Sequence, residues 1–202
     1  MSENTRPAPA CPTLTDYCKH CDLFADLEGL HVIDVHRAAQ HGQLYVVVES
    51  APGLAGCPDC AVLAVSAGRR DVELIDAPVY GTPAKLVWRK RRWRCQDLDC
   101  SRGVFTEQNP AVAAPRALLT RRCIAWGVRQ MRRENLSIQG LARQLGVDWH
   151  TAWAAIRPLL EQAAADERRF TGVKTLGVDE HIWHHVNPAR RGPKALTGMV
   201  DL

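Results

Sequence analysis

Two pairs of cysteines constrain this 202-residue chain more than any other feature of its sequence. Cys57 and Cys60 are separated by two residues, and Cys95 and Cys100 by four. Thiolates hold zinc tetrahedrally, and two short chelating turns can bring four sulfurs to one ion. The pairs bracket a predicted hairpin, which is the arrangement of a zinc ribbon. Because four thiolates leave no open position on the metal, we expect the zinc to be structural.

The cellular compartment decides between metal and disulfides for the eight cysteines. The N-terminal MSENTRPAPACPT has no basic start followed by an apolar core, and no run of 18 apolar residues occurs. A secretory signal and a membrane span are therefore not expected, and the default is a cytoplasmic protein, in which metal is favoured. Four unrelated buried thiols are the alternative. The roles of Cys11, Cys18 and Cys21 are left open, with reduced cysteines favoured over a second zinc.

The charge of the chain is mild overall but unevenly distributed. The net charge is +4, whereas WRKRRWR concentrates cations just before the second cysteine pair, at Arg89, Lys90, Arg91, Arg92 and Arg94. Alternation along a strand puts cations on both faces, so we expect neither face to be buried there. Basic side chains beside tryptophans suit contact with nucleic acid. An edge strand made soluble by charge is the alternative.

A helical region follows, and it has the pattern of a helix-turn-helix. A helix is predicted over 115–135, and Ser137 can cap a short helix that runs to Leu145. Gly146 supplies a left-handed turn, and Asp148 can cap the next helix. Apolar residues fall where this motif buries its core, at Leu141, Leu145, Val147, Ala152 and Ile156. A generic helical hairpin is the alternative.

Candidate DNA contacts in this region lie on two helices. A basic stripe is expected on the helix over 115–135. The second helix of a helix-turn-helix, here the one that Asp148 can cap, enters the major groove of DNA. The candidates are Arg122, Arg129 and Arg133 on the helix over 115–135, and Trp149, His150, Trp153 and Arg157 on the helix after Asp148. The tryptophans suit a packed core equally well.

The segment LGVDEHIW places Asp179 and Glu180 at the end of a short apolar run. A carboxylate there can hold Mg²⁺ for two-metal phosphoryl transfer, although this chemistry needs several carboxylates. Taken alone, such a pair more often marks a strand end that reaches solvent.

The order of these parts resembles the ISL-three type of insertion-sequence transposase. CPDC, WRKRRWRCQDLDCSRGVFTE, the helix-turn-helix and LGVDE cover about Gly56 to Leu202 in the family's order. The resemblance implies a zinc-binding domain and a helix-turn-helix that bind terminal inverted repeats, ahead of an RNase-H-like domain with a DDE triad. Asp179 matches the first catalytic aspartate, whereas Asp201 is not assigned to the triad.

We therefore expect a modular α+β chain that binds double-stranded DNA. The expected parts are a leader (1–16), a β-hairpin region (17–55), a zinc-binding domain (56–112), a helix-turn-helix domain (113–170) and the first strands of an RNase-H-like domain (171–202). The later triad residues have no match, so we expect the chain alone to be inactive in strand transfer, with Mg²⁺ needed only by a full catalytic domain. Association with itself or with full-length transposase, and inhibition of the latter, are left open.

Three rivals remain. A zinc-containing helix-turn-helix transcription regulator has the same binding parts but no reason to carry LGVDE. A small metal-dependent nuclease would need Asp179, Glu180 and Asp201 to cluster, with His181, His184 or His185. A zinc-ribbon RNA binder would prefer single-stranded RNA to duplex DNA.

Overall fold

The computed structural model describes residues 17–38, 42–182 and 195–201. The chain divides into two compact units, residues 1–158 and 159–202. The elements, in order, are α1 (Lys19–Ala25), β1 (His31–Arg37), β2 (Leu44–Glu49), β3 (Val65–Val79), β4 (Thr82–Arg94), β5 (Val104–Thr106), α2 (Arg121–Arg133), α3 (Ile138–Leu145), α4 (Trp149–Ala165), a 3₁₀ helix (Glu167–Phe170), β6 (Leu176–Ile182) and β7 (Ala195–Asp201). The architecture is α+β, with a sheet-rich N-terminal region and four α-helices among the described residues.

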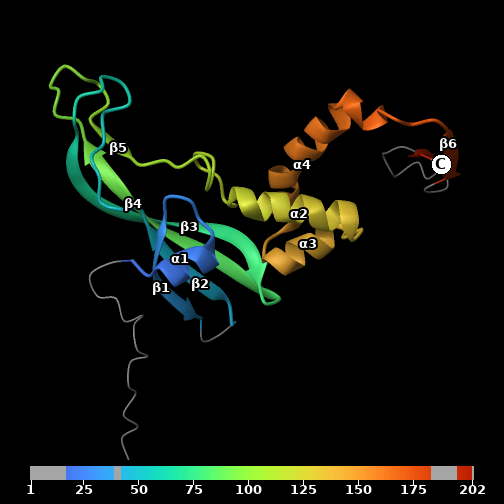
Figure 1. The fold of residues 1–202 in the computed structure, drawn as a ribbon, viewed down its shortest axis with the longest axis horizontal. Coiled ribbons are helices and arrows are strands. Elements are labelled where there is room, and N and C mark those ends of the chain that lie inside the picture. The colour runs from blue at the N-terminus through green and yellow to red at the C-terminus, as the bar shows by residue number, and fades with distance from the viewer. Residues whose placement is uncertain (1–16, 39–41, 183–194, 202) are drawn as a thin grey trace, which may run out of the picture. The chain divides into compact units, whose positions relative to one another are not determined.

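The first unit is built on one five-stranded sheet (Figure 1). Its strand order is β1-β2-β4-β3, and β5 pairs with the end of β4. Strands β1 and β2 form the antiparallel pair expected from the sequence, and β2 then runs parallel to β4. The N-terminal hairpin and the strands between the two cysteine pairs therefore share one sheet.

Strands β3 and β4 form a long curved hairpin that dominates this sheet (Figure 1). The sequence predicts a turn over APVYGTPA, but the structure confines it to Tyr80 and Gly81, with φ of 51° and 73°. Positive φ at both central residues matches the right-handed twist of the flanking strands, so both strands extend to the turn. Pro83 opposes the irregular register between Asp76 and Val79, where a proline in a strand is tolerated.

The hydrophobic core lies on one face of this hairpin. It consists of Leu27, Leu30, Val48, Leu74, Leu86, Trp88, Val112 and Ala113. Trp88 is 1% exposed and Lys90 is 8% exposed, so the prediction that neither face of β4 is buried there was wrong. The core includes residues from 27–30 and from 112–113, which are distant in sequence from β4, and alternation within the strand carries no information about them.

The buried Lys90 is held by its neighbours on the sheet. Its Nζ lies 3.9 Å from the centroid of the Trp88 ring and donates to Gln108 Oε1 at 3.3 Å. Burial lowers the pKa of Lys90. Contact with an aromatic face and one amide oxygen partly replaces the water that the ammonium group loses.

The helix-turn-helix forms with the predicted caps. Ser137 accepts from the backbone N–H of Gly140 at 3.1 Å, Gly146 is left-handed at φ 68°, and Asp148 accepts from the backbone N–H of Thr151 at 2.9 Å. Four predicted core residues are at most 2% exposed, namely Leu141, Leu145, Ala152 and Ile156. Val147 is half-buried.

The first helix of this region is shorter than predicted. Helix α2 begins at Arg121, not near Pro115, because Thr120 caps it by accepting from the backbone N–H of Cys123 at 3.1 Å. The preceding Leu119 is bridged to Ile75 of β3, and residues 115 and 116 lie in a turn, so this segment is not part of the helix. Gly127 of α2 faces α3 and α4, and a Cβ atom there would lie 2.9 Å from Ile156 Cδ1.

The second unit contains the β6–β7 hairpin. The two strands pair antiparallel, and Asp179 is opposite Gly198. None of the helices in the described ranges is long and apolar enough to cross a membrane.

Candidate metal centre and nucleic-acid interface

The two cysteine pairs occupy two turns at the same end of the β3–β4 hairpin. In the first turn the backbone N–H of Cys57 donates to Val62 O at 2.8 Å, and the N–H of Ala61 donates to Cys57 O at 2.8 Å. In the second, the N–H of Cys95 donates to Gly103 O at 2.8 Å, which closes the β4–β5 connection. The hairpin pairing therefore brings the 57–60 turn to the 95–100 turn.

The four sulfurs form a compact cluster. All lie within 4.8 Å of one another, with Cys57 Sγ 3.8 Å from Cys100 Sγ and Cys60 Sγ 3.4 Å from Cys95 Sγ. Zinc–sulfur bonds of about 2.3 Å in a tetrahedron imply sulfur–sulfur separations near ~3.8 Å. The donor set and its dimensions therefore fit one structural zinc ion.

The pKa values of the neighbouring thiols also favour a bound cation. Burial raises the pKa of Cys57, but the backbone N–H groups of Cys60 and Asp59, with neighbouring thiols, bring it to about 7. The backbone N–H of Val62 lowers the pKa of Cys60, whereas burial and the three neighbouring sulfurs raise it, to about 12. Four sulfurs this close cannot all carry charge unless a cation joins them, and a divalent metal supplies that charge.

An ion pair links the two turns beside the cluster. Arg102 Nη2 lies 2.6 Å from Asp59 Oδ1, and both side chains are 43% exposed. Within the cluster Cys57 is 3% exposed and Cys95 8% exposed, whereas Cys60 and Cys100 are half-buried. Four thiolates complete the tetrahedral coordination of a zinc ion, as expected for a structural metal.

One face of the hairpin carries cations whose charge is balanced. On the face opposite the core, Arg69 pairs with Glu49, Lys85 with Glu73 at 2.8 Å, and Arg89 with Asp71 at 3.5 Å. Arg91 also lies on this face, and its Nε and Nη2 donate to Ser50 Oγ and O at 3.2 and 3.0 Å. We call Arg69, Lys85 and Arg89, which pair with carboxylates, the balanced set, and the face that carries them the balanced face.

The other face, beyond the buried Lys90, carries cations without such partners. Strand alternation places Arg92 and Arg94 on the same face as Trp88 and Lys90, and the register Arg70↔Lys90 adds Arg70. All three arginines are exposed, and among the described residues no carboxylate pairs with them. We call Arg70, Arg92 and Arg94 the open arginine set.

The structure thus divides the five cations predicted in WRKRRWR. Among the described residues no carboxylate pairs with Arg92 or Arg94. Arg89 and Arg91 have partners on the opposite face, and Lys90 is buried. Sequence reasoning missed Arg70, because only the register across the hairpin places it beside Lys90. Its signal in the sequence was the dipeptide Arg69-Arg70 next to Asp71.

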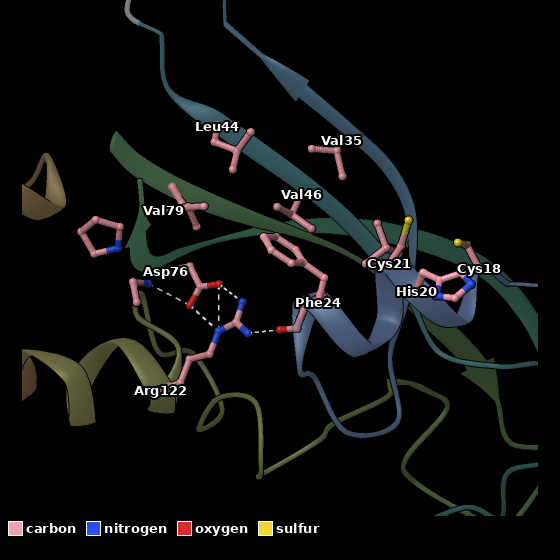
Figure 2. A pocket seen from close by; sticks show the side chains of 15 residues that line it. Cys18, His20, Cys21, Phe24, Val35, Leu44, Val46, Asp76, Val79 and Arg122 are labelled. Atoms are coloured by element: carbon pink, nitrogen blue, oxygen red, sulfur yellow. Dashed lines mark hydrogen bonds and ion pairs between the residues drawn. The ribbon is translucent and has the colours of Figure 1, made fainter. Parts of the chain in front are cut away.

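Arg122, predicted on the basic stripe of α2, is instead part of a joint to the sheet. Its Nε donates to both carboxylate oxygens of Asp76 at 2.8 and 3.0 Å, and its Nη1 donates to the carbonyl of Ala25 (Figure 2). Asp76 is 3% exposed. Arg129 and Arg133, the other members of the stripe, are exposed.

The second helix of the motif, α4, presents an aromatic group near its start. Trp149 is 40% exposed, His150 is exposed, and Trp153 is half-buried. The ring of Trp149 lies 6.0 Å from that of Trp153 in a stacked arrangement, and 5.1 Å from that of His150, edge-on. Arg157 is exposed and makes a contact of its own within the protein.

The predicted catalytic carboxylate lies on the β6–β7 hairpin. Asp179 and Glu180 are both exposed on β6, as is His181. His184 and His185, named as candidates for a nuclease site, fall outside the described residues, and so does Cys11. Among the described residues, only the four cysteines form a group that could hold a metal ion.

Two remaining features of the first unit do not join the metal centre. Cys123 is fully buried in α2, and burial raises its pKa to about 12. Cys18 and Cys21 line an apolar cavity of about 540 Å³ between α1 and the sheet, together with Phe24 and Val46 (Figure 2).

Comparison with known proteins identifies both halves of this region. The family model described as the zinc-finger of transposase IS204/IS1001/IS1096/IS1165 matches residues 54–100. The model described as the helix-turn-helix domain of transposase family ISL3 matches residues 107–160. Searches of curated proteins and of solved structures found no match.

Proposed function

The chain carries the zinc-finger and helix-turn-helix domains of an ISL3-type transposase, and from this premise we propose that it recognises the terminal inverted repeats of an insertion sequence. The function is DNA binding in transposition. The observation that carries the proposal is the exposed start of α4 on a helix-turn-helix whose core and caps are formed.

We assign base contacts to α4 and phosphate contacts to arginines. In a helix-turn-helix, residues in the first turns of the second helix reach base edges in the major groove. His150 is exposed there, and the Trp149 ring, itself 40% exposed, lies beside it. Arg129 and Arg133 of α2, with the open arginine set, are the proposed phosphate contacts, because no carboxylate in the described part of the chain pairs with them.

Zinc has a positional role in this proposal. Cys57, Cys60, Cys95 and Cys100 would hold it, and the ion would supply a fixed link between the two turns. Arg94 directly precedes Cys95, and Val65 lies opposite Arg94 across the hairpin. Fixing the turns therefore fixes the end of β4 that carries Arg92 and Arg94.

We modify the division of the chain in one place. Because β2 pairs with β4, we propose that residues 17–112 form one zinc-containing domain, followed by the helix-turn-helix over 113–170. Residues 171–202 remain the proposed start of an RNase-H-like domain, with Asp179 as its first carboxylate. The exposed position of Asp179 on a strand is compatible with Mg²⁺ binding once further carboxylates are supplied.

The proposed protein partners follow from binding to the two terminal repeats. A protein that binds terminal repeats acts in the bacterial cytoplasm at the nucleoid, and two repeat ends would bring two copies, or a copy and full-length transposase, together. These associations belong to the proposal.

The test is binding of the zinc-loaded protein to duplex DNA carrying the terminal repeats that flank its gene. Scrambled duplex of equal length and composition is the control, and affinity is measured over a salt series. We expect repeat-specific binding that weakens with salt and is lost on Cys57→Ser. Equal binding to both duplexes would contradict recognition of the repeats, and binding to single-stranded RNA in preference to either would favour the RNA-binding alternative.

A base-contact variant sharpens this test. We expect His150→Ala to weaken repeat binding by roughly ten- to a hundredfold and to relax preference at one or two base pairs, as for loss of one base contact. Gln139→Ala is the matched control, because Gln139 is an exposed polar residue on α3. Unchanged preference in His150→Ala would remove this residue from the proposed interface.

A further inference from the structure

The open arginine set and the Asp76–Arg122 anchor of the helix-turn-helix lie on the same face of the β3–β4 hairpin, at opposite ends. Asp76, which anchors α2 through Arg122, follows Leu74 by alternation on β3 and so lies on the core face. Arg92 and Arg94 lie on that face at the zinc end.

Hydrogen bonds and close packing hold the helix-turn-helix at the turn end of the hairpin. The backbone N–H of Thr120 donates to Ile75 O at 3.0 Å, and the Thr120 hydroxyl donates to Asp76 Oδ1 at 2.7 Å. At the turn of the motif, a Cβ atom on Gly146 would lie 3.6 Å from Pro83 Cβ, so this turn packs on the first residues of β4. The position of the motif is thus set by the strand itself.

The strand between the two modules has a defined length. From Pro83, where the motif packs, to Arg92 and Arg94 the chain runs without a break in β4. At about 3.3 Å per residue, the path along this curved strand from Pro83 to the two arginines is roughly 30–36 Å, which is the largest separation that the strand allows. One turn of B-DNA is about 34–36 Å long, or about 10 base pairs.

We propose that the β3–β4 hairpin is a spacer that holds two contacts with one DNA duplex at a fixed separation of no more than about one helical turn. The helix-turn-helix makes the contact at one end, and the open arginine set binds phosphates at the other. The partner is thus a duplex long enough to carry both contacts. This inference rests on the proposed DNA binding and extends it to the geometry of the site.

Hydroxyl-radical footprinting tests the spacing. The probe is a duplex selected from a random library of about 40 base pairs by the zinc-loaded full chain. We expect two protected segments with centres no more than about 10 base pairs apart. Arg92→Ala/Arg94→Ala should lose protection in one segment and keep it in the other, while Lys85→Ala/Arg89→Ala, from the balanced set, keeps both.

An insertion in the probe tests whether the spacer is stiff. Adding about 5 base pairs between the protected segments turns one of them to the opposite face of the duplex, so its protection should be lost. Retained protection of both segments would mean independent, flexibly joined contacts and would overturn the spacer. Unchanged zinc content and circular dichroism in each variant show that its fold is intact.

The outcomes distinguish failure of the spacer from failure of the proposed DNA binding. One protected segment that Arg92→Ala/Arg94→Ala leaves unchanged would overturn the two-contact geometry while DNA binding stands. Failure of the selection to enrich any duplex would overturn the proposed function itself, and the spacer with it.

Discussion

Asp76 of β3 and Arg122 of α2 form an ion pair that joins the sheet to the helix-turn-helix. The Asp76 carboxylate is buried and accepts from the Arg122 guanidinium, from the Thr120 hydroxyl and from the backbone N–H of Ala77. Arg122 also donates to the carbonyl of Ala25, so α1 takes part in the same joint (Figure 2). A residue that looked like a DNA contact in the sequence thus holds two modules together.

Removing one partner of this pair should destabilise the protein. We expect Arg122→Ala to lower the free energy of unfolding by about 3 kcal/mol, because it leaves the Asp76 carboxylate buried without its cation. The value is at the low end for buried pairs, since the Arg122 side chain remains 35% exposed. Urea unfolding followed by circular dichroism measures it. Arg129→Ala, an exposed change on the same helix, should alter stability by less than about 0.5 kcal/mol.

A double variant separates the charge from the packing. Asp76→Leu/Arg122→Met removes both charges and should recover most of the stability lost in Arg122→Ala, because no buried charge is left without a partner. A double variant as unstable as the sum of its single variants would show that the pair does not interact energetically.

The two faces of the hairpin should differ in their contribution to DNA binding. Arg92→Ala/Arg94→Ala should reduce the slope of log affinity against log salt by about 2, because each phosphate contact releases about one counterion. Lys85→Ala/Arg89→Ala should change the slope by much less, since Glu73 and Asp71 already meet these charges. Equal slopes for the two double variants would contradict the distinction between the faces.

Metal analysis tests the sulfur cluster. We expect about one zinc per chain, lost in Cys57→Ser and in Cys95→Ser and on treatment with a strong chelator, with unfolding of the β3–β5 end of the sheet. Cys123→Ala should keep its zinc, because Cys123 lies in α2 outside the cluster. Full zinc content in Cys95→Ser would remove this residue from the ligand set.

Gly127 should not tolerate a larger residue. A Cβ atom there would lie 2.9 Å from Ile156 Cδ1 and 3.1 Å from Leu141 Cδ2, so Gly127→Val must push the three helices apart. Overpacking of this kind costs about 1–3 kcal/mol. Thermal unfolding should show the loss, whereas Ala154→Val at an exposed position of α4 should show a much smaller one. Equal losses would point to the β-branched side chain and not to helix contact.

The cap of α4 should depend on pH. The hydroxyl and the backbone N–H of Thr151 donate to Asp148 and hold the pKa of its carboxyl below the usual value. The folded pKa is lowered, so the stabilisation is complete above the ordinary aspartate pKa and is lost as the pH falls through the folded value. Thr151→Val should raise the pKa of Asp148, as followed by NMR titration. An unchanged pKa would assign the shift to the backbone alone.

Features that depend on neighbours in sequence were determined by the sequence alone. The spacing within each cysteine pair predicted two chelating turns, and Ser137, Gly146 and Asp148 occur at the caps and turn where they were expected. Each of these features joins residues within a few positions of each other, so chemistry and spacing suffice to predict it. The zinc-finger and helix-turn-helix regions that the family models match likewise carry motifs contained in short segments.

The tertiary structure alone decided the roles of the cations. Four cations in basic segments look alike in the sequence but differ in the structure. Arg122 forms an ion pair with the buried Asp76, and Lys90 is itself buried. Arg89 pairs with Asp71 at the surface, whereas Arg92 is exposed and belongs to the open arginine set. Their partners lie on other strands or helices, and Asp76 is 46 positions from Arg122. A charge on a strand is free or engaged according to what the fold places opposite it, and that information is absent from the strand's own sequence.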